Sequence, residues 1–242
     1  MPEGRFGEKV KSLGRAQADL EQALSHIGGN HQLREKIQGR TAAIQTELTQ
    51  MAAEATGRGQ QLYGESNCDG AFMAFSESLS TNQGNRSEAL FLRALCSVQK
   101  QQPESAIKDL NESLQLIPQQ PEALFQRANC QRLKRDLQAA LVDMNAAAQM
   151  GHAGAAQQVV PLQQEIQAEQ HYQQAQAMFQ KQDFPATDQM CAQALAVFPA
   201  HAAAIVLQKE ARDAMAADMA IAHVTTQAMD LKPTSNGSKP HK

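Results

Sequence analysis

The side chains that could do chemistry in this sequence are its seven histidines and four cysteines. No two histidines form the HExxH pattern, in which successive turns of one helix bring two imidazoles to a zinc ion. The four cysteines are far apart and form no CxxC pair; they are Cys68, Cys96, Cys130 and Cys191. We therefore expect no metal site, and four buried, reduced thiols that are typical of an intracellular protein.

Motifs for phosphate binding and for nucleophilic catalysis are also missing. The sequence has no GxxxxGK[ST] loop, no GxGxxG after a strand and no GxSxG turn. Its carboxylates fall on helix faces that we expect to be in water. The sequence therefore predicts a protein that is not an enzyme, has no catalytic residues and needs no cofactor.

Charge and composition exclude two further classes of function. The formal net charge is -3, the pI is about 6.2, and acidic and basic residues are interspersed. Such a surface has no basic footprint for nucleic acid and no polybasic run for anionic membranes. The N-terminal residues lack the apolar core of a signal peptide, and no apolar run reaches the roughly 20 residues that span a bilayer. We expect a cytoplasmic protein that binds neither nucleic acid nor membrane.

The elements that position the side chains are predicted to be helices, because the chain is rich in Ala, Gln, Leu, Glu and Met. A repeat indicates how these helices are arranged. The segment EALFLRALC, from Glu88 to Cys96, returns as EALFQRANC, from Glu122 to Cys130, with seven of nine letters identical and an offset of 34 residues. This period is typical of a helix–turn–helix repeat.

Small residues recur at fixed steps within each repeat. The steps from Ala94 reach Ala106, Leu110, Ser113 and Pro118, and similar steps start at Gly59, Ala128 and Ala175. A small residue on each of two helices lets their backbones approach closely, and a proline or turn residue then ends the second helix. The pattern predicts pairs of closely packed antiparallel helices.

In these features the chain resembles the tetratricopeptide-repeat family. The resemblance implies an all-α fold in which helix pairs stack into a right-handed solenoid. The expected repeats occupy residues 52–86, 87–120, 121–154 and 168–201, within 52–200, and an insertion lies near 155–167. The family's usual Leu-Gly pair is replaced by Arg93-Ala94 and Arg127-Ala128, as is common in its co-chaperone branch. We expect the insertion either to lengthen the next helix, which would run from about Pro161 to Lys181, or to form a short separate helix.

The two ends of the chain are predicted to be helical as well. Residues 1–51 contain two seams with coiled-coil spacing, Val10 to Ile27 and Ile37 to Met51, separated by Gly28-Gly29-Asn30. They predict either a helical hairpin folded on the first repeat or a short coiled coil that makes a homodimer. Residues 201–229 predict a capping helix, and residues 230–242 predict a disordered tail. The expected apolar side of the cap contains Ile205, Ala211, Ala214, Met215, Met219 and Ala222.

The resemblance also implies a concave groove lined by the first helix of each repeat. The residues expected to contact a partner there are Phe91, Leu95, Phe125, Gln126, Asn129, Arg132, Tyr172 and Gln173, with Leu92 and Gln176 beside them. Each of these residues could instead pack between repeats.

Some members of the family hold the acidic tails of heat-shock chaperones with a clamp of Lys, Arg and Asn. The places of that clamp are filled here by Phe91, Leu95, Gln126, Glu169 and Gln173, or, one repeat earlier, by Thr56, Gln60, Leu92, Glu122 and Gln126. Neither set contains a cation, so we expect no clamp.

The sequence therefore predicts a scaffold or adaptor, or a structural subunit of an intracellular complex, that binds a neutral, partly apolar segment of another protein in the groove. One alternative is a substrate-holding co-chaperone that dimerises through its N-terminal helices. A secretion-system chaperone of similar repeat type is a further alternative.

Overall fold

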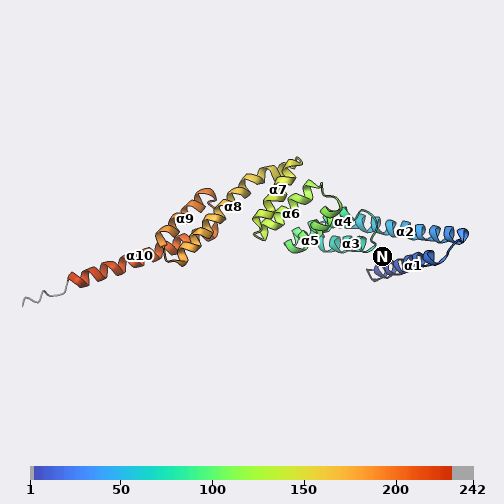
Figure 1. Ribbon diagram of the computed structural model, residues 1–242, viewed down its shortest axis with the longest axis horizontal. Coiled ribbons are helices and arrows are strands. Elements are labelled where there is room, and N and C mark those ends of the chain that lie inside the picture. The colour runs from blue at the N-terminus through green and yellow to red at the C-terminus, as the bar shows by residue number, and fades with distance from the viewer. Residues whose placement is uncertain (1–2, 231–242) are drawn as a thin grey trace, which may run out of the picture. The chain divides into compact units, whose positions relative to one another are not determined.

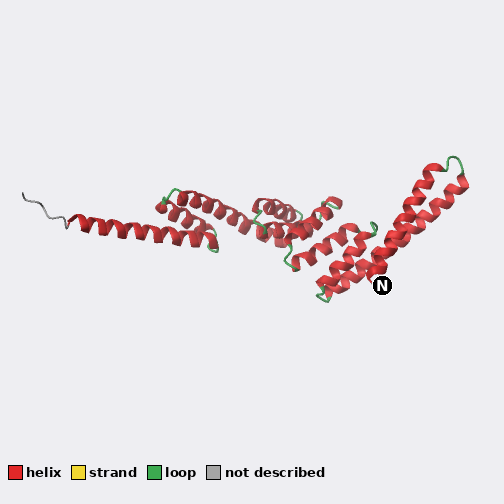
Figure 2. Cartoon of the chain, turned by 90° about the horizontal axis from the view of Figure 1, so that it is seen from below, coloured by secondary structure: helices red, strands yellow, loops and turns green. Residues whose placement is uncertain are grey.

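The computed structural model describes residues 3–230, which form ten helices and no strand (Figures 1 and 2). The helices are α1 (Glu3–His26), α2 (His31–Gly64), α3 (Cys68–Ser80), α4 (Arg86–Gln99), α5 (Pro103–Leu116), α6 (Pro121–Leu133), α7 (Leu137–Gln149), α8 (Ala153–Gln180), α9 (Phe184–Val197) and α10 (Ala202–Asp230). The all-helical fold predicted from the sequence is confirmed. The predicted tail falls on residues 231–242, which lie outside the described part of the chain.

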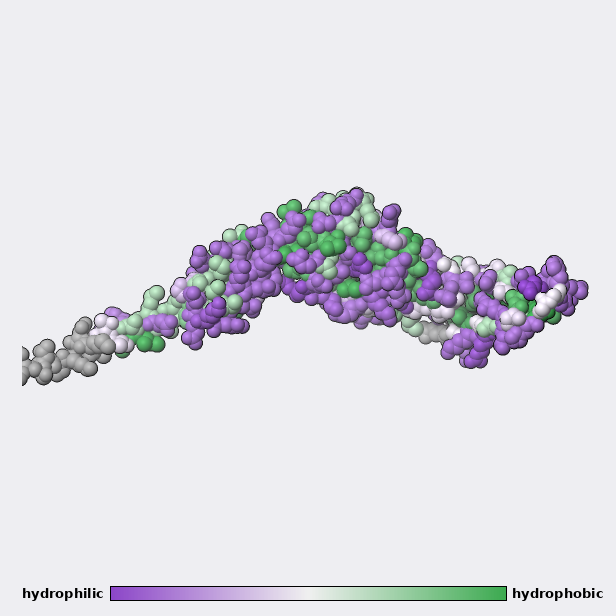
Figure 3. All heavy atoms as spheres, in the orientation of Figure 1, coloured by the Kyte–Doolittle hydropathy of each residue, from purple (hydrophilic) through white to green (hydrophobic). Residues whose placement is uncertain are grey.

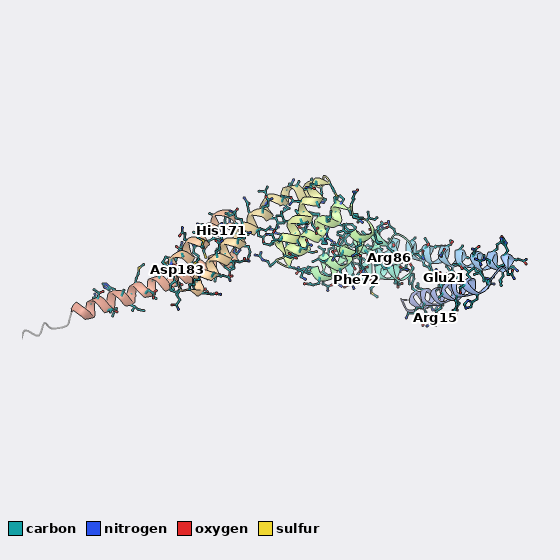
Figure 4. All side chains as sticks on the ribbon, in the orientation of Figure 1. Arg15, Glu21, Phe72, Arg86, His171 and Asp183 are labelled. Carbon is teal, nitrogen blue, oxygen red and sulfur yellow. The ribbon has the colours of Figure 1, made fainter. Side chains whose placement is uncertain are left out.

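Several helix starts are marked by a short polar side chain that accepts a hydrogen bond from the first turn. Asn67 and Asn85 cap α3 and α4 in this way, and Asp136 and Asp183 cap α7 and α9. Figure 4 labels Asp183 at the start of α9. These bonds satisfy amide groups that have no partner within the helix.

The chain divides into two compact units, Met1–Val159 and Val160–Lys242, with the boundary inside α8. The repeat boundaries predicted from the sequence stay predictions.

Unit 1 begins with a helical hairpin of α1 and α2, which lie side by side in both ribbon views. Residues of the two predicted seams pack against each other within this hairpin. Phe6 is buried against Met51 and Ala55, with Val10 and Leu13 packed on the same cluster. Lys9 Nζ pairs with Glu47 Oε1 at 2.7 Å. The C-terminal half of α2 continues without a break into the first repeat, so the hairpin and that repeat share one helix.

Three helix pairs follow in unit 1: α2 with α3, α4 with α5, and α6 with α7. The small residues predicted from the spacing are buried at the contacts within these pairs, among them Ala94, Ala106, Ala128 and Ala140. Gly59 shows why such residues must be small. A Cβ added there would lie 2.5 Å from Cε1 of Phe75, a side chain that is itself fully buried.

The two central repeats each contain a two-point ion pair between their helices. Arg93 on α4 donates to both carboxylate oxygens of Asp109 on α5, each at 2.7 Å. Arg127 on α6 makes the same pair of 2.7 Å bonds to Asp143 on α7. Each arginine also reaches the preceding repeat, at Ser76 and Asn111 respectively. The Arg-Ala pairs seen in the sequence therefore join three helices.

Arg93 also lies over the ring of Phe72, 5.4 Å from its centroid, and Figure 4 labels Phe72. This ring belongs to α3, so the contact adds to the link between α4 and the preceding repeat.

Unit 2 contains the C-terminal part of α8, α9 and α10. Ala168 and Ala175 of α8 are buried against Ala194 and Cys191 of α9. Helix α10 completes the same two clusters through Ala204 and Leu207. The last repeat is thus covered by a further helix, as expected of a solenoid end.

The prediction of where α8 begins was wrong. The insertion does lengthen this helix rather than form a separate one, but α8 begins at Ala153, and Pro161 lies inside it. Proline removes one backbone donor, which leaves the carbonyl of Gln157 without its partner in the helix. Gln157 is an exposed residue.

The predicted apolar side of α10 was right only in part, since Ala211 is buried and Ala214 and Met215 are half-buried. Ala204, Leu207 and Ala211 are buried, whereas Ile205 is 50% and Met219 is 70% exposed. Alanines lie all round this helix, so its composition does not single out one apolar face. Only the first part of α10 covers α9, and residues 216–227 are exposed.

Hydrophobic surface gathers mainly over the middle of unit 1, where α4 to α7 lie (Figure 3). Leu133 and Val142 are its most exposed large apolar side chains there. Within residues 3–230, every helix is too short or too polar to cross a bilayer.

Candidate functional site

Helices α4 and α6 are in contact and carry six of the eight residues predicted to bind a partner. We call this set the α4–α6 surface; it comprises Phe91 and Leu95 on α4, and Phe125, Gln126, Asn129 and Arg132 on α6. All six side chains are half-buried. They are therefore accessible in part, and apolar and polar groups are mixed.

The polar groups of the α4–α6 surface differ in how they are paired. The amide of Gln126 donates to Oε1 of Glu122, one turn earlier, at 2.8 Å. Within the described residues the carboxamide of Asn129 has no hydrogen-bond partner. Because an unpaired, half-buried amide is costly unless water or a ligand satisfies it, Asn129 is the most open polar position on this surface.

Phe125 is held from one side by a residue that the sequence did not single out. Its ring stacks on His152, with 4.4 Å between centroids and 26° between the planes. His152 Nε2 lies 2.8 Å from Glu122 Oε2, and its Nδ1 accepts a hydrogen bond from the amide of Ala155 at 3.0 Å. Phe125 is thus partly a packing residue between α6 and the start of α8.

The carboxyl of Glu122 has a lowered pKa. Burial opposes its ionisation, but the hydrogen bonds from Gln126 and His152 and the nearby imidazole outweigh that effect. Glu122 therefore places a negative charge beside Phe125 and Gln126.

Tyr172 and Gln173 lie on α8 in unit 2, so the structure does not bring all eight predicted residues into one site. Tyr172 packs on both buried clusters of that unit, and its hydroxyl accepts from Gln176 at 2.9 Å. Gln173 is exposed. Leu92 is likewise a packing residue, since it lies on the cluster of Ala71, Phe75 and Cys96.

The arrangement of Glu122, Phe125 and His152 has a counterpart in unit 2, formed by Glu169, Tyr172 and His201. His201 lies 3.3 Å from Glu169 through Nε2, caps α10 through the amide of Ala204 at 3.1 Å, and faces Tyr172 at 5.1 Å. The sequence contains a signal for this arrangement. A glutamate is followed after three residues by an aromatic, at Glu122 and again at Glu169, and a histidine stands before the next helix in both cases.

Cavities open at other places in unit 1. One of about 470 Å³ lies between α1 and α3 and is lined by Phe6, Phe72 and Met73, among others. Another of about 330 Å³ lies between α5 and α6, beside Leu114 and Leu124. Within residues 3–230, no three histidine, cysteine or acidic side chains are grouped so as to hold a metal ion.

Burial suppresses the reactivity of the thiols. It raises the pKa of Cys96 and of Cys130 to about 11, and it also raises the pKa of Cys191. Cys68 is half-buried and donates to Gln99 Oε1. At neutral pH the three buried cysteines are packing residues rather than nucleophiles.

No protein-family model matches the chain, and no curated protein sequence matches it. Solved structures do. The TPR domain of P58(IPK) matches with a TM-score of 0.53 at 15% identity, over 86% of this chain and 56% of that one. YrrB, a TPR protein with an unusual peptide-binding site, matches with 0.41 at 19% identity, over 86% and 91%. The first TPR of Spaghetti (RPAP3), bound to an HSP90 peptide, matches with 0.46 at 15% identity, over 49% and 94%.

At these identities the likeness shows a shared fold only. The argument for the fold rests on the match to the P58(IPK) domain, and the chain spans little more than half of that domain's length. The 34-residue repeat and the consecutive helix pairs point the same way. The chain therefore has the tetratricopeptide-repeat fold.

Proposed function

We propose that this protein is a non-catalytic scaffold or adaptor that binds a segment of another protein on the α4–α6 surface. The observation that carries the proposal is the unpaired, half-buried carboxamide of Asn129. It lies on the same helix as Gln126 and Arg132, and α4 beside it contributes Phe91 and Leu95. An amide that can both donate and accept suits the backbone of an extended or helical segment.

The apolar members of the surface set the chemistry of the partner. Phe91, Leu95 and Phe125 would bury apolar side chains of the segment, at roughly 25 cal/mol for each Å² removed from water. Glu122 adds negative charge at the edge, and the places of the chaperone-tail clamp contain no cation. A neutral, partly apolar segment therefore fits better than an acidic tail.

Partner capture from the native cells tests the proposal. Full-length chain carrying Asn129→Ala or Leu95→Ala is compared with the wild type and with Gln138→Ala, a change at an exposed position of α7. A partner lost with both surface variants but kept by Gln138→Ala supports the proposal. If every variant captured the same partners as the wild type, binding would have to occur at another surface.

Direct titration then tests the chemistry of the surface. The captured partner's segment should bind with little change between low and moderate salt, because few ion pairs form. A steep loss of affinity with salt would contradict a neutral segment.

The alternative of a dimerising co-chaperone receives less support. The seams that could have joined two copies pack against each other in the α1–α2 hairpin, where Phe6 and Met51 are buried. If the protein formed a concentration-dependent dimer and suppressed the aggregation of unfolded proteins, the co-chaperone alternative would be favoured instead.

A further inference from the structure

Two histidines begin helices of this protein in the same way. His152 stands before α8 and His201 before α10. In each case Nδ1 accepts the amide N–H three residues on, from Ala155 at 3.0 Å and from Ala204 at 3.1 Å. These side chains take the place that asparagine or aspartate has at other helix starts.

The other ring nitrogen has the same kind of partner in both places. His152 Nε2 lies 2.8 Å from Glu122, and His201 Nε2 lies 3.3 Å from Glu169. Each glutamate is on the first helix of the preceding pair, and the aromatic residue three positions later covers the imidazole. Because the arrangement occurs once in each unit, it is a repeated device of this chain rather than a single contact.

Both bonds form together in only one protonation state. A nitrogen accepts a hydrogen bond only when it carries no proton, so Nδ1 must be bare and the proton must be on Nε2, which donates to the glutamate. A second proton on Nδ1 would direct an N–H at the amide N–H of Ala155 or Ala204. The capping bond would then be lost while the bond to the glutamate persists.

We propose that His152 and His201 are protonation-sensitive caps, which release the first turns of α8 and α10 when Nδ1 takes up a proton. The titratable groups that face the rings are Glu122 at His152, and Glu169 and the phenol of Tyr172 at His201. The amide caps Asn67 and Asn85 do not titrate, and the carboxyl group of an aspartate cap such as Asp136 has an acceptor oxygen in either protonation state. Acidification therefore acts selectively on the two histidine-capped helices.

One consequence reaches the α4–α6 surface. Phe125 rests on the ring of His152, so a change at that cap alters the support beneath one of the residues that we expect to bind a partner. This consequence rests on the proposed function, whereas the release of the helix starts does not.

Residue-resolved hydrogen exchange on the full-length chain tests the proposal without a partner. Protection factors, corrected for intrinsic exchange, are compared between about pH 7.5 and about pH 5, the interval in which histidine changes charge. The amides of Ala155 and Ala204 should lose roughly five-fold in protection, the factor for one lost capping bond. The amides of Ala139 and Ala186, capped by Asp136 and Asp183, should not change. An equal change at all four amides would overturn the proposal.

Substitution of the histidines gives the matched control. His152→Asn and His201→Asn keep an oxygen acceptor at the cap but remove the titrating group, so the loss of protection on acidification should disappear. Persistence of that loss in both variants would contradict the proposal. Should a variant fail to fold, nitrogen NMR shifts of the wild-type imidazoles at about pH 8 decide the matter, since a proton on Nδ1 in that state excludes the cap.

Discussion

The central repeats and the last repeat of this protein use the same small residues but different links between their helices. In α4–α5 and α6–α7 a half-buried arginine pairs with a buried aspartate and joins the two helices, at Arg93–Asp109 and Arg127–Asp143. The equivalent positions of the α8–α9 pair, 47 residues after Arg127 and Asp143, hold Gln174 and Met190. Gln174 is exposed, and Met190 packs on the cluster of Ala175, Cys191 and Leu207.

This difference teaches which part of the repeat the packing requires. Close approach of the two helices needs a small residue on each, and that feature is shared by Ala94, Ala128 and Ala175, all fully buried. The space beside these small residues is filled by an ion pair in the central repeats and by apolar side chains in the last repeat. Apolar contact serves the last repeat, where α10 rather than a further full repeat covers the surface.

The largest effect is expected from breaking one central ion pair. Arg93→Ala leaves the carboxylate of Asp109, whose side chain is 3% exposed, without its partner. We expect a loss of about 3–5 kcal/mol in the free energy of unfolding, since an unpaired buried charge is costly. Denaturant titration measures this, and Gln174→Ala in the last repeat should change the value by no more than about 0.5 kcal/mol. Equal losses for the two variants would erase the distinction between the repeats.

Transplanting the last repeat's residues into a central one sharpens the comparison. Arg127→Gln alone strands Asp143, whereas Arg127→Gln with Asp143→Met reproduces the pair Gln174 and Met190. Apolar groups of similar size often replace a buried ion pair at little cost, so the double variant should regain most of the stability that the single variant loses. Unfolding free energies of the wild type, both single variants and the double variant form the required cycle. A double variant as unstable as Arg127→Gln would show that the central repeats need the charges themselves.

The same contrast shows what the sequence could predict. The spacing of Ala94, Ala106 and Gly59 predicts the helix pairs, because only small residues fit where two backbones approach. The partners of a residue on another helix are harder to predict. The sequence shows a recurring spacing of glutamate, aromatic residue and histidine at Phe125 and Tyr172. The spacing alone does not reveal that the imidazole rings pack on these two aromatic rings. The exposed C-terminal part of α10 was not predicted for a related reason. Alanines lie on every side of this helix, so its sequence does not indicate which face is buried.

The four thiols differ in burial, since Cys68 is half-buried and the other three are buried. Cys96 and Cys130 have a pKa of about 11, and burial raises the pKa of Cys191 too, so at about pH 8 few of these groups are thiolates. A thiol reagent should therefore modify half-buried Cys68 at least roughly ten times faster than the other three. Labelling followed by mass spectrometry of the fragments gives the order, and fast reaction of Cys191 alone would mark the last repeat as the looser one.

The raised thiol pKa also fixes the direction of an alkaline effect. The fold favours the neutral thiols, so their contribution to stability is complete below the unfolded pKa of about 8.5 and is lost as pH rises towards about 11. Cys130→Ala should flatten this alkaline decline in unfolding experiments, and a decline as steep as that of the wild type would contradict the assignment to buried thiols.

The smallest expected effect concerns the acid side and Glu122, whose lowered pKa is the result of its bonds to Gln126 and His152 prevailing over burial. A carboxyl with a lower pKa in the folded state stabilises the fold above its unfolded pKa of about 4.3, and that contribution disappears as pH falls through the folded value. Because Glu122 is 51% exposed, solvent screens the interaction, and Glu122→Gln should cost less than about 1 kcal/mol at neutral pH. The difference from the wild type should shrink on acidification, as both side chains become neutral. A difference that stays constant from neutral pH to about pH 3 would mean that Glu122 acts through its shape rather than its charge.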